Sequence, residues 1–259
     1  MQLTVIGSGS SGNAYIIVGK NGTQIMVDCG FRFCTLKQRM SECALEVDAT
    51  RAVFFTHDHS DHCAGAAAFH KRCPGAHFFA NGNTADAIAE KTGLHDGWDV
   101  FETADSFEFE EFSVTTFSVP HDAADPVGYV ISDGDATLFI GTDMGCATLA
   151  AQVALTGADC AILEANHDPV LLETSQRAWS LKQRIAGRSG HLANEESAAL
   201  LRAAAPTHLK HLLLAHLSSE CNSPSLARAA FVEAMREMNL TSVELNVLAQ
   251  DAAFGPINF

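Results

Sequence analysis

Short runs of apolar residues, rich in Val, Ile, Leu and Phe, recur along the whole chain and alternate with stretches whose apolar residues return every three or four positions. Runs of the first kind are typical of buried strands, and the second pattern is typical of helices that cover a sheet. In the first half the pattern predicts strands at residues 3–6, 15–18, 24–28 and 53–55 and helices at residues 33–44, 64–72 and 84–91. Asn21-Gly22 predicts a hairpin turn between the second and third of these strands.

The second half continues the alternation without a linker. It predicts strands at residues 107–109, 114–119, 127–132, 136–140, 160–163, 212–215 and 243–247. It predicts helices at residues 147–155, 175–185, 194–204 and 223–238. Because a chain of 259 residues with 47% hydrophobic content can bury a large core, we expect one α/β domain that spans residues 1–259.

The segment with the most distinctive chemistry directly follows the strand predicted at residues 53–55. It brings His57, His59, Asp61 and His62 together within six residues. A loop at the end of a buried strand lets donors converge, and imidazole and carboxylate groups suit zinc, manganese or iron. His57 and His59 could share one ion, while Asp61 and His62 could serve a second. The alternative, a polar loop with incidental histidines, is disfavoured because histidines rarely cluster without a ligand role.

The spacing His57-x-His59-x-Asp61-His62 after a hydrophobic strand resembles the signature of the metallo-β-lactamase superfamily of binuclear metallohydrolases. Upstream, the Asp28-Cys-Gly element resembles the strand-end element that braces the metal loop in that superfamily. The resemblance implies three further ligands at strand ends in a fixed order, and the residues that fit are His121, Asp143 and His216. It also implies the αβ/βα four-layer sandwich fold, with the site at the edge where strands end.

By that resemblance the seven donors form two sites with a shared bridge: His57, His59 and His121 for one ion, Asp61, His62 and His216 for the second, and Asp143 between them. A water between the two cations would then be the nucleophile, which makes Asp61 a catalytic residue as well as a ligand. One alternative leaves half of the site empty. Another makes His121 a core histidine, but Pro120 and Asp122 beside it favour a functional loop.

Five further segments narrow the resemblance to the YycJ-like (WalJ-like) branch: residues 8–13, 121–129, 163–168, 190–195 and 215–218. That branch implies 5′→3′ exonuclease activity on double-stranded DNA, and its relatives include ribonuclease Z and phosphodiesterases that open cyclic sugar phosphates. In ribonuclease Z-like relatives a His before a helix, oriented by a Glu at an earlier strand end, contacts the scissile phosphate and protonates the leaving oxygen. His191 and Glu164 fit these two roles here. The alternative for His191 is a turn residue without a chemical role.

A basic segment precedes His191. Residues 174–194 contain no acidic residue but carry Trp179, Arg184 and Arg188. Arg177 and Arg184 are expected two helical turns apart, where they could follow a phosphate backbone, and Trp179 could stack on a terminal base. The alternative is a solvated helix face.

Two loops supply the remaining candidates for substrate contact. The glycine-rich segment that ends at Asn13 could face an anion with its backbone, but it lacks the Gly-Lys-Ser/Thr ending of a nucleotide P-loop. We expect a tight turn beneath the metal site, from which Asn13 or Ser11 could reach a phosphate. His167 and Asp168, beyond the strand at residues 160–163, could line the pocket, although a simple turn explains them equally well.

The formal net charge of −15 opposes broad attraction to a polyanion. A phosphodiesterase that acts on DNA ends is still the preferred function, because the acid-free segment is local and two cations would offset part of the negative charge. One alternative is a hydrolase for a small cyclic phosphate or another ester. A binding protein with weak catalysis is disfavoured by the complete ligand set, and β-lactam hydrolysis is disfavoured by Asp143.

The sequence also indicates where the protein is located and whether its cysteines are reduced. No apolar stretch approaches the ~20 residues of a membrane span, and the chain starts without a signal-peptide pattern. The eight cysteines form no CxxC pair. We therefore expect a cytoplasmic protein with reduced thiols and no membrane contact.

Overall fold

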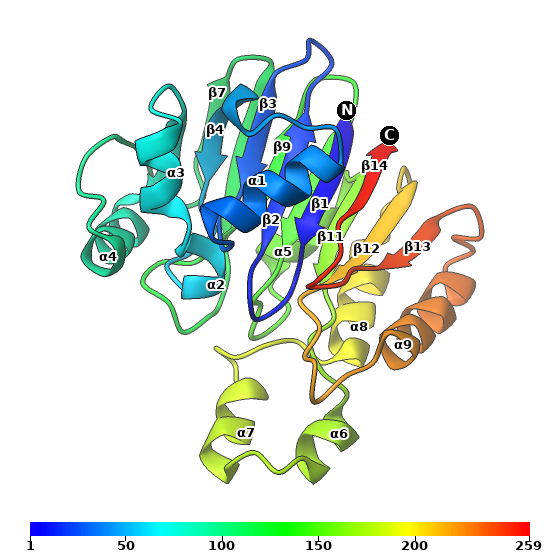
Figure 1. The fold of residues 1–259 in the computed structure, drawn as a ribbon. Helices are drawn as coiled ribbons and strands as arrows, with labels where there is room; N and C mark the ends of the chain where they lie inside the picture. The colour runs from blue at the N-terminus through cyan, green and yellow to red at the C-terminus, as the bar shows by residue number, and fades with distance from the viewer.

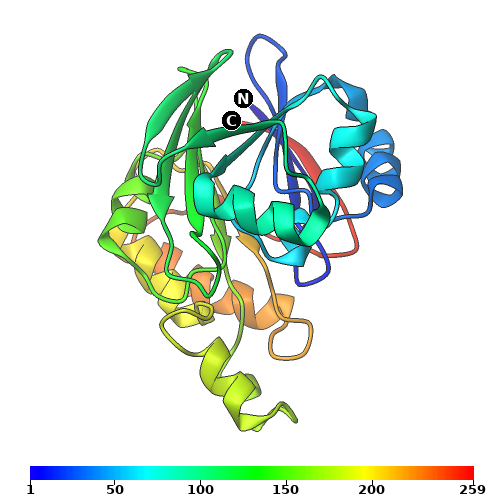
Figure 2. The same ribbon diagram turned by 90° about the vertical axis from the view of Figure 1, so that its left-hand side faces the viewer.

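Two seven-stranded sheets pack face to face at the centre of the molecule, and helices cover their outer faces (Figure 1, Figure 2). This computed structural model describes residues 1–259. The first sheet has the order β14-β1-β2-β3-β4-β5-β6, with β1 at Gln2–Gly7, β2 at Ala14–Val18, β3 at Gln24–Val27, β4 at Thr50–Phe54, β5 at His77–Asn81, β6 at Trp98–Phe101 and β14 at Phe254–Asn258. The second has the order β13-β12-β11-β10-β9-β8-β7, with β7 at Ser106–Phe109, β8 at Phe112–Ser118, β9 at Val127–Ser132, β10 at Thr137–Gly141, β11 at Cys160–Glu164, β12 at His211–Ala215 and β13 at Glu244–Val247.

The helices divide between the two outer faces. The first sheet is covered by α1 (Phe33–Glu42), α3 (Ala66–Arg72) and α4 (Gly82–Thr92), and the second by α5 (Leu149–Thr156), α8 (Asn194–Ala204) and α9 (Pro224–Glu237). A short helix, α2 (Ser60–Cys63), lies within the histidine-rich loop, and a 3-10 turn covers Val47–Ala49. The remaining helices, α6 (Pro169–Thr174) and α7 (Trp179–Ile185), project beyond the sandwich (Figure 1).

Alternation of side chains along the strands builds the layers. In β2, Tyr15 packs into the cluster between the sheets, whereas Ile16 packs beneath the helices of the first sheet. In β12, Leu213 lies between the sheets and Leu214 lies beneath the helices of the second sheet. Strands buried on both faces have continuous apolar sequences, as these do. The result is the αβ/βα four-layer sandwich expected from the sequence.

The parallel strands determine at which edge of each sheet the site residues can meet. In the first sheet β3, β4, β5 and β6 run parallel, and in the second sheet β10, β11, β12 and β13 run parallel. Loops that follow neighbouring parallel strands emerge at the same edge of a sheet. The loops after β3, β4, β10, β11 and β12 carry most of the candidate site residues described below. His121 lies in the loop between the antiparallel strands β8 and β9.

Most predicted elements exist, with boundaries shifted by one or a few residues. The hairpin turn is present, because Gly22 has the left-handed φ of 90° and donates its N–H to the Gly19 carbonyl at 3.0 Å. Three strands, β5, β6 and β14, were not predicted. The helix predicted at residues 175–185 is wrong in its first part, because the chain forms α6, a turn and then α7. The missed signal for α6 is Asp168-Pro169, since Asp168 caps the helix by accepting a hydrogen bond from Leu171 N at 2.8 Å and proline is favoured at the first helical position.

All eight cysteines are free thiols, and five of them are buried. None of the helices combines the length and the apolar character that a bilayer crossing requires.

Candidate metal centre

The backbone turns sharply where three candidate side chains leave the sheets. Asp28 follows β3 with a φ of 59°, Asp143 follows β10 with a φ of 58°, and His216 follows β12 with a φ of 55°. A non-glycine residue in this left-handed region costs roughly 1–3 kcal/mol and persists only where its surroundings fix it. The strained positions therefore coincide with the sheet edge at which the side chains converge.

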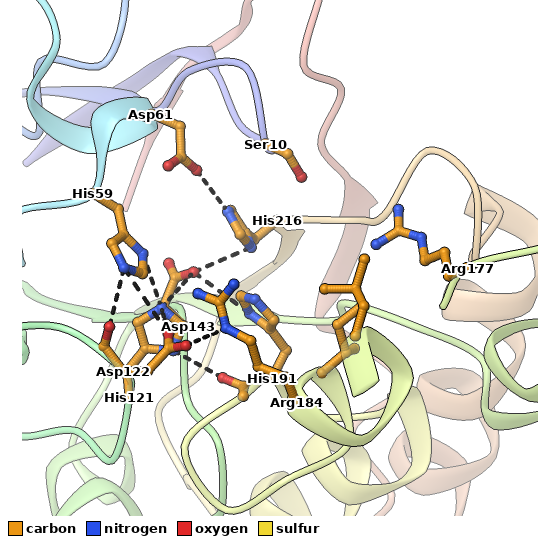
Figure 3. A pocket seen from close by; sticks show the side chains of 13 residues that line it. Ser10, His59, Asp61, His121, Asp122, Asp143, Arg177, Arg184, His191 and His216 are labelled. Atoms are coloured by element: carbon orange, nitrogen blue, oxygen red, sulfur yellow. Dashed lines mark hydrogen bonds and ion pairs between the residues drawn. The ribbon is translucent and has the colours of Figure 1, made fainter. Parts of the chain in front are cut away.

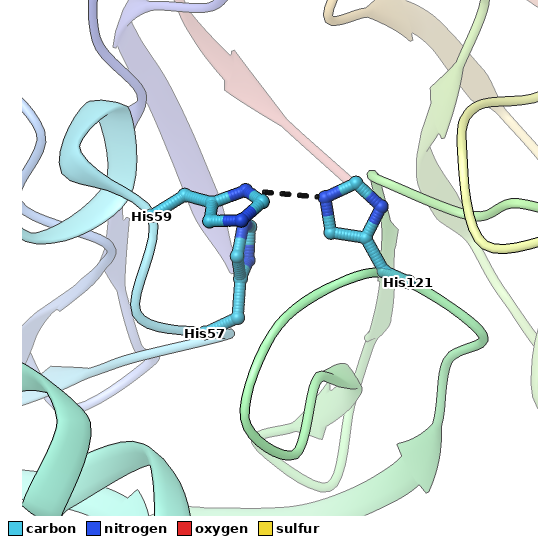
Figure 4. A group of neighbouring side chains, drawn as sticks. All are labelled: His57, His59 and His121. Atoms are coloured by element: carbon cyan, nitrogen blue, oxygen red, sulfur yellow. Dashed lines mark hydrogen bonds between the residues drawn. The ribbon is translucent and has the colours of Figure 1, made fainter. Parts of the chain in front are cut away.

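One group of donors consists of three imidazoles (Figure 4). His121 Nε2 lies 3.2 Å from His59 Nδ1, and the ring of His57 lies 4.8 Å from that of His59, centroid to centroid. His121 Nδ1 donates to the Gly190 carbonyl at 2.9 Å, and Thr56 Oγ1 lies 2.9 Å from His57 Nδ1. Because these outer contacts use Nδ1, both rings present Nε2 to the group.

A second group lies beside the first and consists of Asp61, His62 and His216. Asp61 Oδ2 is 3.3 Å from His216 Nε2 and 3.5 Å from His62 Nε2. Asp143 contacts both groups: its Oδ2 is 3.2 Å from His62 Nε2, and its Oδ1 is 3.8 Å from His121 Nε2. The fold thus brings together the seven donors named from the sequence, in two adjacent groups with Asp143 between them.

One buried atom of this cluster, His57 Nε2, has no hydrogen-bond partner. Leaving a buried polar atom unpaired costs roughly 1–3 kcal/mol, and native proteins rarely keep one without a functional reason. Imidazole nitrogens with carboxylate oxygens are the donors that divalent transition metals prefer. The residues therefore fit divalent cations, and within each group the donor atoms lie within 4.8 Å of one another.

The charges in the cluster are strongly coupled. Burial by itself would raise the pKa of Asp143, but the imidazoles of His216 and His62 outweigh burial and hold that pKa well below its usual range. Burial would lower the pKa of His216, but the carboxylates of Asp143 and Asp61 outweigh it and raise that pKa to about 10. Protons and cations therefore compete for the same nitrogen atoms.

The Asp28-Cys-Gly element braces the histidine-rich loop from below. Asp28 Oδ1 accepts hydrogen bonds from the Thr56 backbone N–H at 2.9 Å and from the Thr56 hydroxyl at 3.0 Å, and Oδ2 lies 2.7 Å from His62 Nδ1. Gly30 lets the loop approach closely, because a Cβ at this position would lie 1.8 Å from the Asp61 carbonyl oxygen. The brace fixes the loop and orients one of its imidazoles.

A further anchor of the loop was missed in the sequence. Asp58, between the first two histidines, accepts a hydrogen bond from Ala124 N at 2.9 Å and pairs with Lys91 of α4. It therefore ties the loop to the segment that carries His121. Its position inside the histidine motif was the available signal.

His191 and Glu164 form a pair beside the donor groups. His191 Nδ1 donates to Glu164 Oε1 at 2.8 Å, and the other oxygen of Glu164 accepts the N–H of Met144 at 2.7 Å. Burial by itself would lower the pKa of His191, but Glu164 and then Asp143 outweigh it and raise that pKa above its ordinary value. Since Nδ1 is engaged by Glu164, Nε2 is the nitrogen available to a substrate.

A pocket of about 200 Å³, here called the metal pocket, lies between this cluster and α7 (Figure 3). Its walls include His59, His121, His191, His216, Asp61 and Asp143 on one side and Arg177, Leu181, Arg184 and Ile185 on the other. Arg177 Nε donates to Glu220 at 2.9 Å, and Arg184 Nε donates to Asp122. The terminal Nη atoms of both arginines have no partner in the chain, which leaves them free to bind an anion in the pocket.

The structure corrects several predicted substrate contacts. Asn13 is fully buried, and its amide lies 3.0 Å from His62 Nε2, so it supports the loop while its neighbour Ser10 lines the pocket. Arg177 precedes α7, so it is not two helical turns from Arg184 as predicted, yet both reach the same pocket.

Three other candidates lie outside the metal pocket. Arg188 is exposed on the loop after α7 and is not part of the pocket wall. His167 and Trp179 line a separate cavity on the opposite face of α7. These positions depend on how α6 and α7 fold against the body, which residue order alone does not specify.

Comparison with protein families agrees with this geometry. Residues 23–216, which contain all seven donors, match the β-lactamase superfamily domain. The chain belongs to this superfamily, and it is a metal-dependent hydrolase with the metallo-β-lactamase fold.

Particular relatives narrow the comparison. The chain is 29% identical to the exodeoxyribonuclease YycJ of Bacillus anthracis and 30% identical to the exodeoxyribonuclease WalJ of Streptococcus pneumoniae serotype 2, in each case over 92% of this chain and 90% of the relative. The crystal structure of the short form of human tRNase Z shares the fold, with a TM-score of 0.66 and 16% identity over the whole of both chains. The resemblance to the YycJ-like branch seen in the motifs is thus confirmed over nearly the full length.

Proposed function

We propose that this protein is a binuclear metal-dependent phosphodiesterase that digests double-stranded DNA from its ends in the 5′→3′ direction. The observation that carries the proposal is the pocket, where two adjacent donor groups face two arginines whose terminal nitrogens are unpaired. The names of the relatives YycJ and WalJ support DNA as the substrate and exonucleolysis as the activity.

The seven donors would hold two divalent cations, zinc or manganese, with iron as a further candidate. His57, His59 and His121 would hold one, and Asp61, His62 and His216 the other, with Asp143 shared by both. When bound, such a pair supplies a water nucleophile at neutral pH and offsets the charge that develops on the phosphate.

The chain's own residues complete the reaction. His191 donates a proton from Nε2 to the leaving oxygen, because Glu164 holds Nδ1 and raises the pKa of the ring. Glu164 is fully buried and also accepts a backbone N–H, so it fixes the direction in which the imidazole points. Asp61 acts both as a ligand and as part of the wall that positions the phosphate.

Arg177 and Arg184 would hold phosphate oxygens through their free Nη groups. The arginines give the pocket free N–H donors despite the overall charge of −15, because Glu220 and Asp122 bind their Nε sides and leave their terminal Nη groups open. Arg188, on the exposed loop after α7, could reach a more distant phosphate of a polymer.

A small phosphodiester, such as a cyclic sugar phosphate or another ester, is the second candidate substrate. The limited volume of the pocket, about 200 Å³, favours it, since this space takes one phosphate group with part of its sugar. A DNA end also satisfies the limit, because only the scissile nucleotide needs to enter.

One assay panel separates these substrates. The protein loaded with zinc or with manganese is incubated with end-labelled duplexes that carry a 5′ phosphate or a 5′ hydroxyl, with a nitrophenyl phosphodiester and with a cyclic sugar phosphate. Stepwise shortening of the duplex from the 5′ end is the expected result. Turnover of only the small compounds would overturn the DNA assignment.

A further inference from the structure

Helix α7 separates two cavities. One face lines the metal pocket with Leu181, Arg184 and Ile185. The opposite face lines a second cavity of about 440 Å³, here called the α6–α7 cavity, with Trp179, Lys182, Gln183 and Ala186. Both sets follow the spacing of three or four residues that places side chains on one helix face. Since a helix with its side chains is about 10–12 Å across, the α6–α7 cavity lies a few nucleotides or less from the metal pocket.

The α6–α7 cavity has a defined shape because its walls are fixed to the body. Leu172 of α6 and Ile185 of α7 form a buried cluster with Cys221. Lys182 Nζ donates to the carbonyls of Glu173 and Ser175, at 2.6 and 2.7 Å, and so joins α7 to the end of α6. The ammonium group of Lys182 is therefore bound to carbonyls of the protein itself, and its side chain forms one side of the cavity.

The chemistry of the cavity combines an exposed aromatic face with a buried ring nitrogen. Trp179 is 69% exposed, which is unusual for so large an apolar side chain. His167, in contrast, is only 3% exposed, and its Nδ1 has no hydrogen-bond partner. Its Nε2 also makes no hydrogen bond within the chain, but this nitrogen is not sealed from solvent as Nδ1 is. Burial lowers the pKa of His167, so the neutral ring offers one donor and one acceptor.

We propose that the α6–α7 cavity binds an unpaired nucleobase of the DNA strand whose phosphate lies in the metal pocket. This inference rests on the proposed nuclease function and extends it. Trp179 stacks on the base, and His167 Nε2 forms a hydrogen bond with its edge. The strand between the two cavities then passes along a segment, residues 174–194, that has no acidic side chain.

Charge supports a base rather than a second phosphate in this cavity. The one basic side chain in its wall, Lys182, is bound to carbonyls, and Glu173 contributes a carboxylate. An anion would meet no free cation there, whereas a neutral aromatic ring meets Trp179, Pro169 and Leu172. The two faces of α7 therefore match the two parts of a nucleotide, with phosphate on the arginine face and base on the tryptophan face.

A double-mutant cycle between protein and substrate tests the proposal. Single-turnover rates at subsaturating metal-loaded enzyme are measured for wild type and Trp179→Ala on duplexes that carry either a normal nucleotide or an abasic one at each of the first few positions. At one position the abasic substitution should slow wild type about tenfold, and Trp179→Ala should slow the normal duplex similarly. The two losses should not add, because both changes remove the same contact. Trp179→Phe should recover part of the rate.

The controls separate this inference from the proposed function. Leu149→Ala, at an exposed apolar residue of α5, should leave every rate unchanged. Additive losses, or rates insensitive to abasic sites at all positions, would overturn the base site while leaving the nuclease assignment intact. Wild type that turns over only a small phosphodiester would overturn both. Loss of the nitrophenyl diesterase activity in Trp179→Ala in the same proportion as DNA cleavage would assign Trp179 a structural role and reject the proposal.

Discussion

Asp28 Oδ2 lies 2.7 Å from Nδ1 of His62, and both side chains are completely buried. A carboxylate at this distance keeps the ring proton on Nδ1, so that Nε2 offers its lone pair to the donor cluster. The Asp28 side chain does not line the metal pocket, yet it determines how one of the donors is presented.

Replacing Asp28 by Asn should weaken metal binding while the protein still folds. Asparagine tolerates the left-handed backbone of this position, but its neutral amide no longer stabilises the ring in the required form. Loss of such an outer contact typically lowers metal affinity about 10–100-fold. Competition with a chelating dye measures the affinity, and Asp135→Asn, at an exposed carboxylate, is the control. Equal affinities in the two variants would contradict the role of Asp28.

Removing one donor of the second group should reduce the metal content from two ions to one. We expect Asp61→Ala to lose one ion per chain and to lose hydrolysis, because the remaining group cannot offset the charge on both oxygens of the reacting phosphate. Folding should persist, since Asp61 lies at the pocket wall. Elemental analysis of the dialysed protein gives the stoichiometry, with Asp99→Ala on β6 as the matched variant. Full activity of Asp61→Ala would exclude a binuclear mechanism.

The sequence named the seven candidate donors partly from a local motif and partly from the resemblance to a known family, and the fold brings these side chains together. Four of the seven, His57, His59, Asp61 and His62, lie in one short loop after an apolar run. The other three were named from the resemblance, which implies a His, an Asp and a His at successive strand ends. Parallel strands bring such ends to one edge without any detailed knowledge of packing. The four-layer arrangement was implied by the same resemblance, and it agrees with continuous apolar strands that must be covered on both faces.

The positions of the residues proposed to contact substrate were harder to predict, because they depend on partners that are distant in the sequence. The side chain of Arg184 is oriented by its hydrogen bond to Asp122. That of Arg177 is oriented by its hydrogen bond to Glu220, which is 43 residues away in the chain. Asn13 lies in a loop whose glycines indicated an anion site, but its side chain turns inward to His62. In each case the orientation of a side chain is decided by a contact that no local pattern encodes.

Glu164→Gln should affect DNA cleavage more than cleavage of an activated ester. The glutamine side chain can still accept the N–H of Met144, but it no longer favours the protonated form of His191. We expect a loss of about 10²–10⁴-fold on DNA, whose leaving oxygen needs a proton. A nitrophenyl phosphodiester needs none, so its rate should fall far less. On DNA the alkaline limb of the pH profile, where the general acid loses its proton, should move to lower pH, because Glu164 no longer raises the pKa of His191. A uniform loss on both substrates would argue that Glu164 only maintains the fold.

Arg184→Gln should weaken DNA binding in a salt-dependent manner. If Arg184 contacts one phosphate, its loss lowers the slope of log affinity against log salt by about 0.9. Arg177→Gln should behave similarly, because both arginines line the same pocket. Arg236→Gln is the control, since that arginine lies exposed on α9 and pairs with Glu233. Fluorescence anisotropy of labelled DNA at several salt concentrations gives the slopes, and an unchanged slope in Arg184→Gln would remove this arginine from the contact.

The stability of the protein should depend on pH in opposite ways with and without metal. His216 has a pKa of about 10 in the fold, against an ordinary value of about 6.5 in an unfolded chain. Because the folded pKa is raised, the stability that this ion pairing contributes is fully present below about pH 6.5 and is lost as pH rises towards 10. The raised pKa of His191 changes the stability in the same direction. The depressed pKa values of Asp61 and Asp143 stabilise the fold above the ordinary pKa of a carboxyl group, and this contribution is lost only as the pH falls into the acid range.

Metal reverses this trend because it requires unprotonated nitrogens, so binding strengthens as pH rises. The expected result is a melting temperature that falls from pH 6.5 to pH 9.5 in chelator, whereas the increase caused by added manganese grows over the same interval. His216→Asn should flatten both curves, while Lys20→Gln, at an exposed ion pair, should not. A manganese-induced increase that is the same at both ends of the interval would mean that protons and metal do not share these donors.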